Sequence, residues 1–259
     1  MTETIAFQKP INIAGQKIHY QSKGKSPRIV IFLGVGQSGR NLETITKNIA
    51  SGIVVEALPY HSFRRDELGA AGLAAVNAII DIALKTTGKP IHIIAESQAA
   101  PGAVVAANHR PNDIASLTLL APLGFNKNFL GNTDAERYRN LMQRSRAFWN
   151  HPNQRLTIKG NRTTLQNVIT ASLFKLHRIK PDYTFGANQD VAVTACELAK
   201  HVPITIYADP HDSLFPYSEI TSTIAKSPIT LIRTAIGSHI NRATPLGLAE
   251  LQNVITAIK

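Results

Sequence analysis

The sequence predicts an α/β fold in which helices cover both faces of a mostly parallel sheet. Short apolar runs rich in isoleucine, valine and leucine alternate along the chain with longer segments whose apolar residues recur at helical spacing. In addition, 44% of the 259 residues are hydrophobic and 17% are charged, which is typical of a globular protein with a sizeable core. Strands that alternate with helices pack as parallel strands between two helical layers.

The N-terminal part predicts a β-hairpin that adds antiparallel strands to one edge of this sheet. Its strands are residues 4–13 and 16–22, and the turn falls at Ala14 and Gly15. The alternation of strands and helices begins after the hairpin. The expected strands are residues 28–33 and 52–58, and the expected helices are residues 41–50 and 66–85.

The alternation continues, with one interruption, to the end of the chain. The further strands expected are residues 91–94, 116–120, 204–208 and 229–235, and the further helices are residues 99–108, 218–225 and 245–258.

Residues 126–200 interrupt this pattern. They contain helix-like segments at 134–149 and 163–177 but no clear strand, and they carry 12 Lys or Arg against 5 Asp or Glu. The apolar faces of these segments are too small to fold alone. We therefore predict a core made of residues 1–125 and 201–259, covered by a helical cap made of residues 126–200.

The composition excludes several classes of function. The net charge of +11 comes from scattered lysines and arginines, which indicates a positively biased surface rather than a nucleic-acid site. A single cysteine, Cys196, excludes a disulfide framework and a cysteine-built zinc site, and it is expected to be a buried helical thiol. The sequence shows neither a signal peptide nor an apolar run of bilayer length, so we expect a cytoplasmic protein. No metal-ligand spacing is present, and neither a metal nor a cofactor is expected.

A glycine-rich turn follows the first predicted parallel strand. Gly34, Gly36 and Gly39 fit the Gly-x-Gly-x-x-Gly pattern between a strand and a helix, and Glu56 lies near the end of the next strand. This is the sequence context of a dinucleotide-binding fingerprint. Such a turn also lets a backbone N–H point at a developing negative charge without an intervening Cβ. The turn alone leaves both interpretations open.

Ser97 lies where a buried strand turns into an apolar helix. A serine between small residues at such a turn is typical of a nucleophile elbow, although the usual Gly-x-Ser-x-Gly has Ala95 and Ala99 in place of its glycines. Alanine is small but is strained wherever positive φ is required. The alternative is a serine that simply caps the helix.

An acid and a base for this serine follow two later strands. Asp209 and Asp212 come directly after the strand at 204–208, and His239 follows the strand at 229–235. The carboxyl ends of parallel strands form the ligand crevice of an open α/β sheet. Ser97, Asp212 and His239 are therefore expected to meet at one edge of the sheet, as a nucleophile, its orienting acid and its base require.

From about residue 18 to the C-terminus, and weakly between 126 and 200, the chain resembles the α/β-hydrolases, a family of esterase-like enzymes with a cap. Residues 31–38 are similar to the family's His-Gly-x-Gly-x-Ser segment, with Leu33 where histidine is common. Residues 95–100 are similar to the elbow, and residues 208–216 resemble the Gly-x-x-Asp-x-x-x-Pro loop, which favours Asp212 over Asp209.

The resemblance implies a role for each candidate residue. Ser97 is expected to be the nucleophile, Asp212 the orienting acid, and His239 the base, since it falls where the family keeps its catalytic histidine. The backbone N–H groups of Val35 and Gln98 are expected to form the oxyanion hole.

The expected activity is hydrolysis of a carboxylic ester or thioester through an acyl-enzyme. Serine at the elbow disfavours the family's epoxide hydrolases and haloalkane dehalogenases, which use aspartate there. Three alternatives stay open: a carbon–carbon bond hydrolase or lyase using the same triad, a nicotinamide-dependent oxidoreductase using the turn at 34–39, and a catalytically inactive binding module. The expected partner is a small acyl or ester molecule, and the positive cap favours an anionic one. Phe129, Trp149 and Phe174 are expected to line its pocket.

Overall fold

The core of the protein is an eight-stranded sheet with the order β1-β4-β6-β5-β7-β8-β9-β10. The computed structural model describes residues 6–7, 10–13, 16–34, 40–56, 70–150, 190–234 and 245–258. All strands from β5 to β10 are parallel, and β4 and β1 extend one edge in antiparallel fashion, so the predicted fold class is confirmed. The strands are β1 (Ala6–Phe7), β4 (Tyr20–Lys23), β5 (Ile29–Phe32), β6 (Gly52–Val55), β7 (Ile91–Glu96), β8 (Ile114–Leu120), β9 (Ile204–Ala208) and β10 (Thr230–Arg233).

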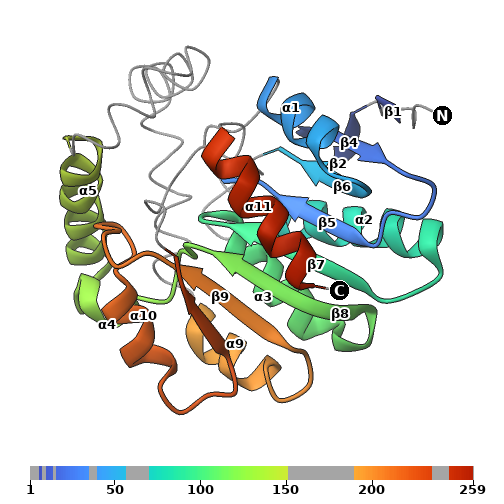
Figure 1. The fold of residues 1–259 in the computed structure, drawn as a ribbon. Helices are drawn as coiled ribbons and strands as arrows, with labels where there is room; N and C mark the ends of the chain where they lie inside the picture. Colours follow the sequence, from blue (N-terminus) through green and yellow to red (C-terminus); the bar gives the residue numbers. More distant parts are fainter. Residues whose placement is uncertain are drawn as a thin grey trace.

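Helices cover both faces of the sheet (Figure 1). Helices α1 and α11 share one buried apolar cluster with the sheet, and α2, α3, α9 and α10 share the other. Successive side chains of β5 enter opposite clusters, Val30 and Phe32 one and Ile31 the other, because strand side chains alternate. Burial on both faces explains why the parallel strands are continuous apolar runs. The helices are α1 (Arg40–Asn48), α2 (Ala70–Thr87), α3 (Ala99–His109), α4 (Lys127–Leu130), α5 (Asp134–Asn150), α9 (Val191–Leu198), α10 (Tyr217–Ile224) and α11 (Pro245–Ala257).

The predicted N-terminal hairpin is divided between two sheets. Its inner parts, β2 (Ile11–Ile13) and β3 (Gln16–Ile18), pair with each other in a separate antiparallel ladder. Its outer parts, β1 and β4, join the large sheet, where β4 also pairs with β6. The division falls at His19, whose N–H donates to the side chain of Glu56 at 2.9 Å. After His19 the chain leaves the ladder between β2 and β3, and β4 pairs with β6 in the large sheet instead.

The strand order contains a topological switch point at β5. The chain passes from β5 to its neighbour β6 on one side and then crosses to β7 on the other side. In open α/β sheets the crevice beyond the carboxyl ends of the strands at such a point is where ligands bind. Gly34 follows β5 and Ser97 follows β7, so these two predicted site residues flank the switch point.

In the described part of the range 126–200, which the sequence assigns to a cap, the structure has three helices. Helix α5 has almost the predicted bounds, while α4 and α9 were not predicted. Helix α9 packs against α3, and its buried residues belong to the large apolar cluster of the core. The predicted helix at 163–177 lies outside the described residues. Within the described residues, no helix combines the length and apolarity needed to cross a membrane.

Candidate active site

Ser97 forms the turn between β7 and α3 with a backbone φ of 50°. A non-glycine residue adopts positive φ only where its surroundings impose it. The Ser97 N–H donates to the Leu120 carbonyl at 2.9 Å, and the Ser97 carbonyl accepts from the N–H groups of Ala100 and Leu123 at 3.1 Å each. These bonds tie the turn to α3 and to the end of β8. A strained serine between a buried strand and a helix has the geometry of a nucleophile elbow.

The two alanines beside this turn carry no backbone strain. Among the described non-glycine residues, only Ser97 and Ala121 have positive φ. Ala95 and Ala99 are fully buried, and α3 presents a row of small side chains to the sheet. A methyl group at each position therefore leaves room for the close approach of α3 to β7. Ala95 and Ala99, which replace the two glycines of the usual elbow motif, therefore introduce no strain from positive φ.

Gly34 lies directly against Ser97. A Cβ on Gly34 would lie 3.2 Å from the Ser97 Cβ and 3.4 Å from the Glu96 side chain, a spacing that few Cβ atoms tolerate. The N–H of Leu33 still donates to Val55 on β6 at 3.1 Å, whereas the N–H of Gly34 donates to Glu96 Oε2 at 3.2 Å. The start of the glycine-rich turn is thus fixed beside the elbow.

Gln98, a predicted oxyanion donor, lies at the start of α3. It is buried and immediately precedes the first residue of α3, with helical φ of −61°. The first N–H groups of a helix have no intrahelical acceptor and favour negative charge. Val35, the other predicted donor, lies outside the described residues.

Glu56, which a dinucleotide site would use for ribose, makes a structural contact instead. Its Oε1 accepts the His19 N–H at 2.9 Å. The pKa of Glu56 is raised, because burial raises it by more than this hydrogen bond lowers it. In the dinucleotide-binding fold with the strand order 3-2-1-4-5-6, the first strand lies between the second and the fourth. Here β5 lies between β6 and β7. Both observations disfavour a dinucleotide site that uses Glu56.

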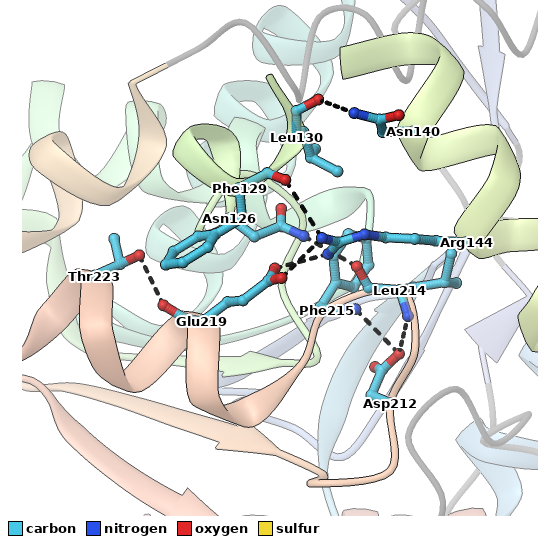
Figure 2. Close-up of polar contacts among 10 residues, drawn as sticks. All are labelled: Asn126, Phe129, Leu130, Asn140, Arg144, Asp212, Leu214, Phe215, Glu219 and Thr223. Carbon is cyan, nitrogen blue, oxygen red and sulfur yellow. Dashed lines mark hydrogen bonds and ion pairs between the residues drawn. The ribbon is translucent and has the colours of Figure 1, made fainter. Parts of the chain in front are cut away.

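Asp212 lies in the loop after β9 and is almost completely buried. Its Oδ1 accepts hydrogen bonds from the N–H groups of Leu214 (2.8 Å) and Phe215 (3.1 Å), which Figure 2 shows. Backbone donors stabilise a carboxylate and fix its orientation. Asp212 is thus held rigidly at the carboxyl end of β9, the sheet edge that also carries Ser97.

Asp209, three residues earlier, is buried as well but has a different arrangement. Its Oδ1 accepts the N–H of His211 at 2.7 Å, and its carbonyl accepts the N–H of Asp212 at 3.1 Å. The side chain of His211 is exposed. Asp209 thus shapes the turn on which Asp212 sits.

Asn126 and Arg144 fasten this acid loop to the helices that follow β8 (Figure 2). The buried Asn126 donates through Nδ2 to the Leu214 carbonyl at 3.0 Å. Arg144 on α5 forms a bidentate pair with Glu219 on α10, with distances of 2.7 and 2.8 Å, and contacts the Phe129 carbonyl at 3.4 Å. Because α10 begins directly after the acid loop, the ion pair holds α5 against the helix that follows Asp212 in the chain.

Replacing Arg144 by methionine is expected to lower the free energy of unfolding by about 1–3 kcal/mol, because it leaves a partly buried carboxylate without its charged partner. The Arg144 and Glu219 side chains are only 23% and 14% exposed. Urea denaturation measures this change. The control is Glu43→Gln, which breaks the exposed Lys47–Glu43 pair (56% and 38% exposed) and should cost less than about 0.5 kcal/mol. Equal losses in the two variants would contradict a special role for the Arg144–Glu219 pair.

The whole fold has relatives among solved structures. No protein-family model and no curated protein sequence matches the chain. A hydrolase from Pseudomonas aeruginosa is similar in structure with a TM-score of 0.66 at 13% identity, covering 99% of this chain and 98% of that one. The chain has the α/β-hydrolase fold.

Two further α/β-hydrolase structures show the same likeness over their whole length. A meta-cleavage product hydrolase from Pseudomonas fluorescens has a TM-score of 0.61 at 13% identity, with 97% of each chain covered. A thioesterase domain from the curacin biosynthetic pathway has a TM-score of 0.58 at 15% identity, covering 99% of this chain and 100% of that domain.

The remaining predicted site residues are His239 and the three aromatic residues that were expected to line the substrate pocket. His239 and Phe174 lie outside the described residues, as does the side chain of Trp149. Phe129 is 44% exposed and lines a cavity of about 460 Å³ between α4, α9 and α10. The lining includes the half-buried thiol of Cys196 but neither Ser97 nor Asp212. Phe129 therefore faces a groove beside the core helices.

Two further features of the site concern metals and residues that sequence reasoning missed. The described part of the chain contains no group of three or more His, Cys, Asp or Glu side chains that could hold a metal ion. Glu96 was overlooked, although a carboxylate between a predicted buried strand and the predicted nucleophile was a usable signal. Asn126 and the pair Arg144–Glu219 gave no such signal, because their partners are far away in the sequence.

Proposed function

We propose that this protein is a serine hydrolase that cleaves a carboxylic ester or thioester through an acyl-enzyme. The observation that carries the proposal is Ser97, held at positive φ at the switch point of the sheet with Gly34 against it. A structural serine that merely caps a helix gains nothing from such a strained backbone. Strain of this kind is common at active sites, where it exposes the reacting group.

The proposed reaction has two steps. As the Ser97 hydroxyl attacks the carbonyl carbon, His239 takes its proton, and Asp212 orients the imidazole and stabilises its charged form. The backbone N–H groups of Val35 and Gln98 stabilise the oxyanion, one such donor lowering the barrier by about 3 kcal/mol. His239 then gives the proton to the departing alcohol or thiol. A water molecule, deprotonated by His239, attacks the acyl-enzyme, and His239 returns this proton to the Ser97 oxygen as the bond to the acyl group breaks and the acid is released.

A carbon–carbon bond hydrolase or lyase is the second candidate, because it would use the same three side chains. The likeness of the fold to a meta-cleavage product hydrolase supports it, and the likeness to a thioesterase supports the first candidate. In both cases the part of residues 126–200 that precedes α9 is proposed to cover the crevice and to shape the substrate pocket. The positive charge of that segment favours acyl substrates that carry a negative charge.

A fluorophosphonate probe tests the proposal directly, because it reacts only with an activated serine. The wild-type protein should be labelled on the peptide that contains Ser97, and Ser97→Ala should remove the label. Labelling that survives the substitution would assign the nucleophile elsewhere. A folded wild-type protein that stays unlabelled would favour the inactive binding module. A panel of p-nitrophenyl esters and acyl thioesters of increasing chain length then ranks the substrates.

A further inference from the structure

The bond between Glu96 and Gly34 lies at the point where the main chain leaves the sheet. Strands β5 and β7 are in register, with Phe32 opposite Ala95. Two residues later the chain turns at Ser97, whose N–H donates to β8. At this level Glu96 Oε2, and not a carbonyl of β7, accepts the N–H of Gly34. The carboxylate thus extends the β5–β7 ladder by one bond.

The position of this bond connects it to the chemistry proposed for Ser97. A Cβ added to Gly34 would lie 3.2 Å from the Ser97 Cβ, and Val35, the predicted oxyanion donor, is the next residue along the chain. Oxyanion donors stabilise the transition state best when they are held in place before the reaction. Ordering a mobile donor during the reaction would offset part of the free energy that its hydrogen bond contributes. A contact that fixes Gly34 therefore bears on the rate of the chemical step.

Glu96 is also unusual as a buried side chain. Only 4% of the residue is exposed, and a carboxylate in such a place is retained only where it makes strong hydrogen bonds. An uncharged residue of the same size would fill this space at lower cost if packing alone were needed.

We propose that Glu96 is a positioning residue of this active site, whose carboxylate holds the backbone of Gly34, the residue before the predicted oxyanion donor, beside Ser97. This inference rests on the proposed serine hydrolase function. Glu96 does not touch the substrate; it acts through the main chain of Gly34.

Three variants of Glu96 test this role. Glu96→Met fills the space but accepts no hydrogen bond, Glu96→Asp keeps the charge but is one methylene shorter, and Glu96→Gln keeps an acceptor oxygen at full length. We expect Glu96→Met to lower kcat for a p-nitrophenyl ester by about 10²- to 10³-fold, Glu96→Asp by about tenfold, and Glu96→Gln by less than about threefold. KM should change little, because the contact matters for the transition state.

The decisive quantity is kcat per active site titrated with the fluorophosphonate. A merely structural role would reduce the number of titratable sites or the melting temperature but leave kcat per site unchanged. The matched control is Glu56→Met, which removes a carboxylate-to-backbone bond directly after the neighbouring strand β6 and should leave kcat per site within about threefold.

The outcomes separate this inference from the proposed function. If Glu96→Met or, should that variant not fold, Glu96→Asp keeps wild-type kcat per titrated site, the inference is overturned and the serine hydrolase stands. If the wild-type protein is neither labelled nor active on any ester or thioester, the proposed function itself fails.

Discussion

Replacing Ser97 by alanine is expected to lower kcat/KM for a p-nitrophenyl ester by a factor of about 10⁴ to 10⁶. The substitution removes the attacking oxygen and leaves the turn, the oxyanion donors and the acid loop in place. Residual hydrolysis above the rate in water then reports what binding and the oxyanion hole contribute. Steady-state kinetics measures the loss, and circular dichroism checks that the variant is folded.

Glycine at the same position separates chemistry from backbone strain. Ser97→Gly should be as inactive as Ser97→Ala, but its free energy of unfolding should be about 0.5–1 kcal/mol higher than that of the alanine variant. Positive φ costs a residue with a Cβ about 1–2 kcal/mol, and the greater freedom of glycine in the unfolded chain offsets part of the gain. If urea denaturation finds the glycine variant less stable than the alanine variant, the turn is not strained at Ser97.

Replacing Asp212 by asparagine is expected to lower kcat by about 10⁴-fold with little change in stability. The asparagine Oδ1 can still accept the N–H groups of Leu214 and Phe215, so the loop keeps its shape. The amide nitrogen, however, would face His239 with a donor where the imidazole requires an acceptor. The histidine would then hold its proton on the wrong nitrogen and could not act as the base.

Asp209→Asn is the matched control for this substitution. Both aspartates are buried in the same loop, and each accepts backbone N–H groups. Because Asp209 shapes the turn and is not the proposed partner of His239, kcat should fall by less than about tenfold. The reverse order of effects would make Asp209 the orienting acid and would overturn the assignment of Asp212.

Most of the core could be predicted because each strand and helix has a strong local pattern. The strand Ile204–Ala208 was predicted to the residue, and the helices starting at Ala99 and Pro245 were predicted within one residue at each end. Parallel strands that are buried on both faces are continuous apolar runs, and the turns between them contain glycine or proline. The position of Ser97 followed from the same local signals.

The division of the N-terminal hairpin and the helix Val191–Leu198 could not be predicted in this way. The hairpin residues alternate as any strand would, and only the neighbouring β6 decides which of them join the large sheet. The helix is short and rich in alanine and valine, and its buried side chains gain their stability from packing on α3 rather than from helix propensity.

By itself, the sequence determined the alternation of elements, the parallel sheet and the serine at a strand-to-helix turn, since these depend on residues that are neighbours in the chain. Tertiary structure alone decided the positive φ of Ser97, the closeness of Gly34, and the contacts of Glu96, Asn126 and Arg144. Each of these contacts joins residues that are far apart in the sequence. Such residues can form a hydrogen bond or limit each other's conformation only after folding has brought their elements together.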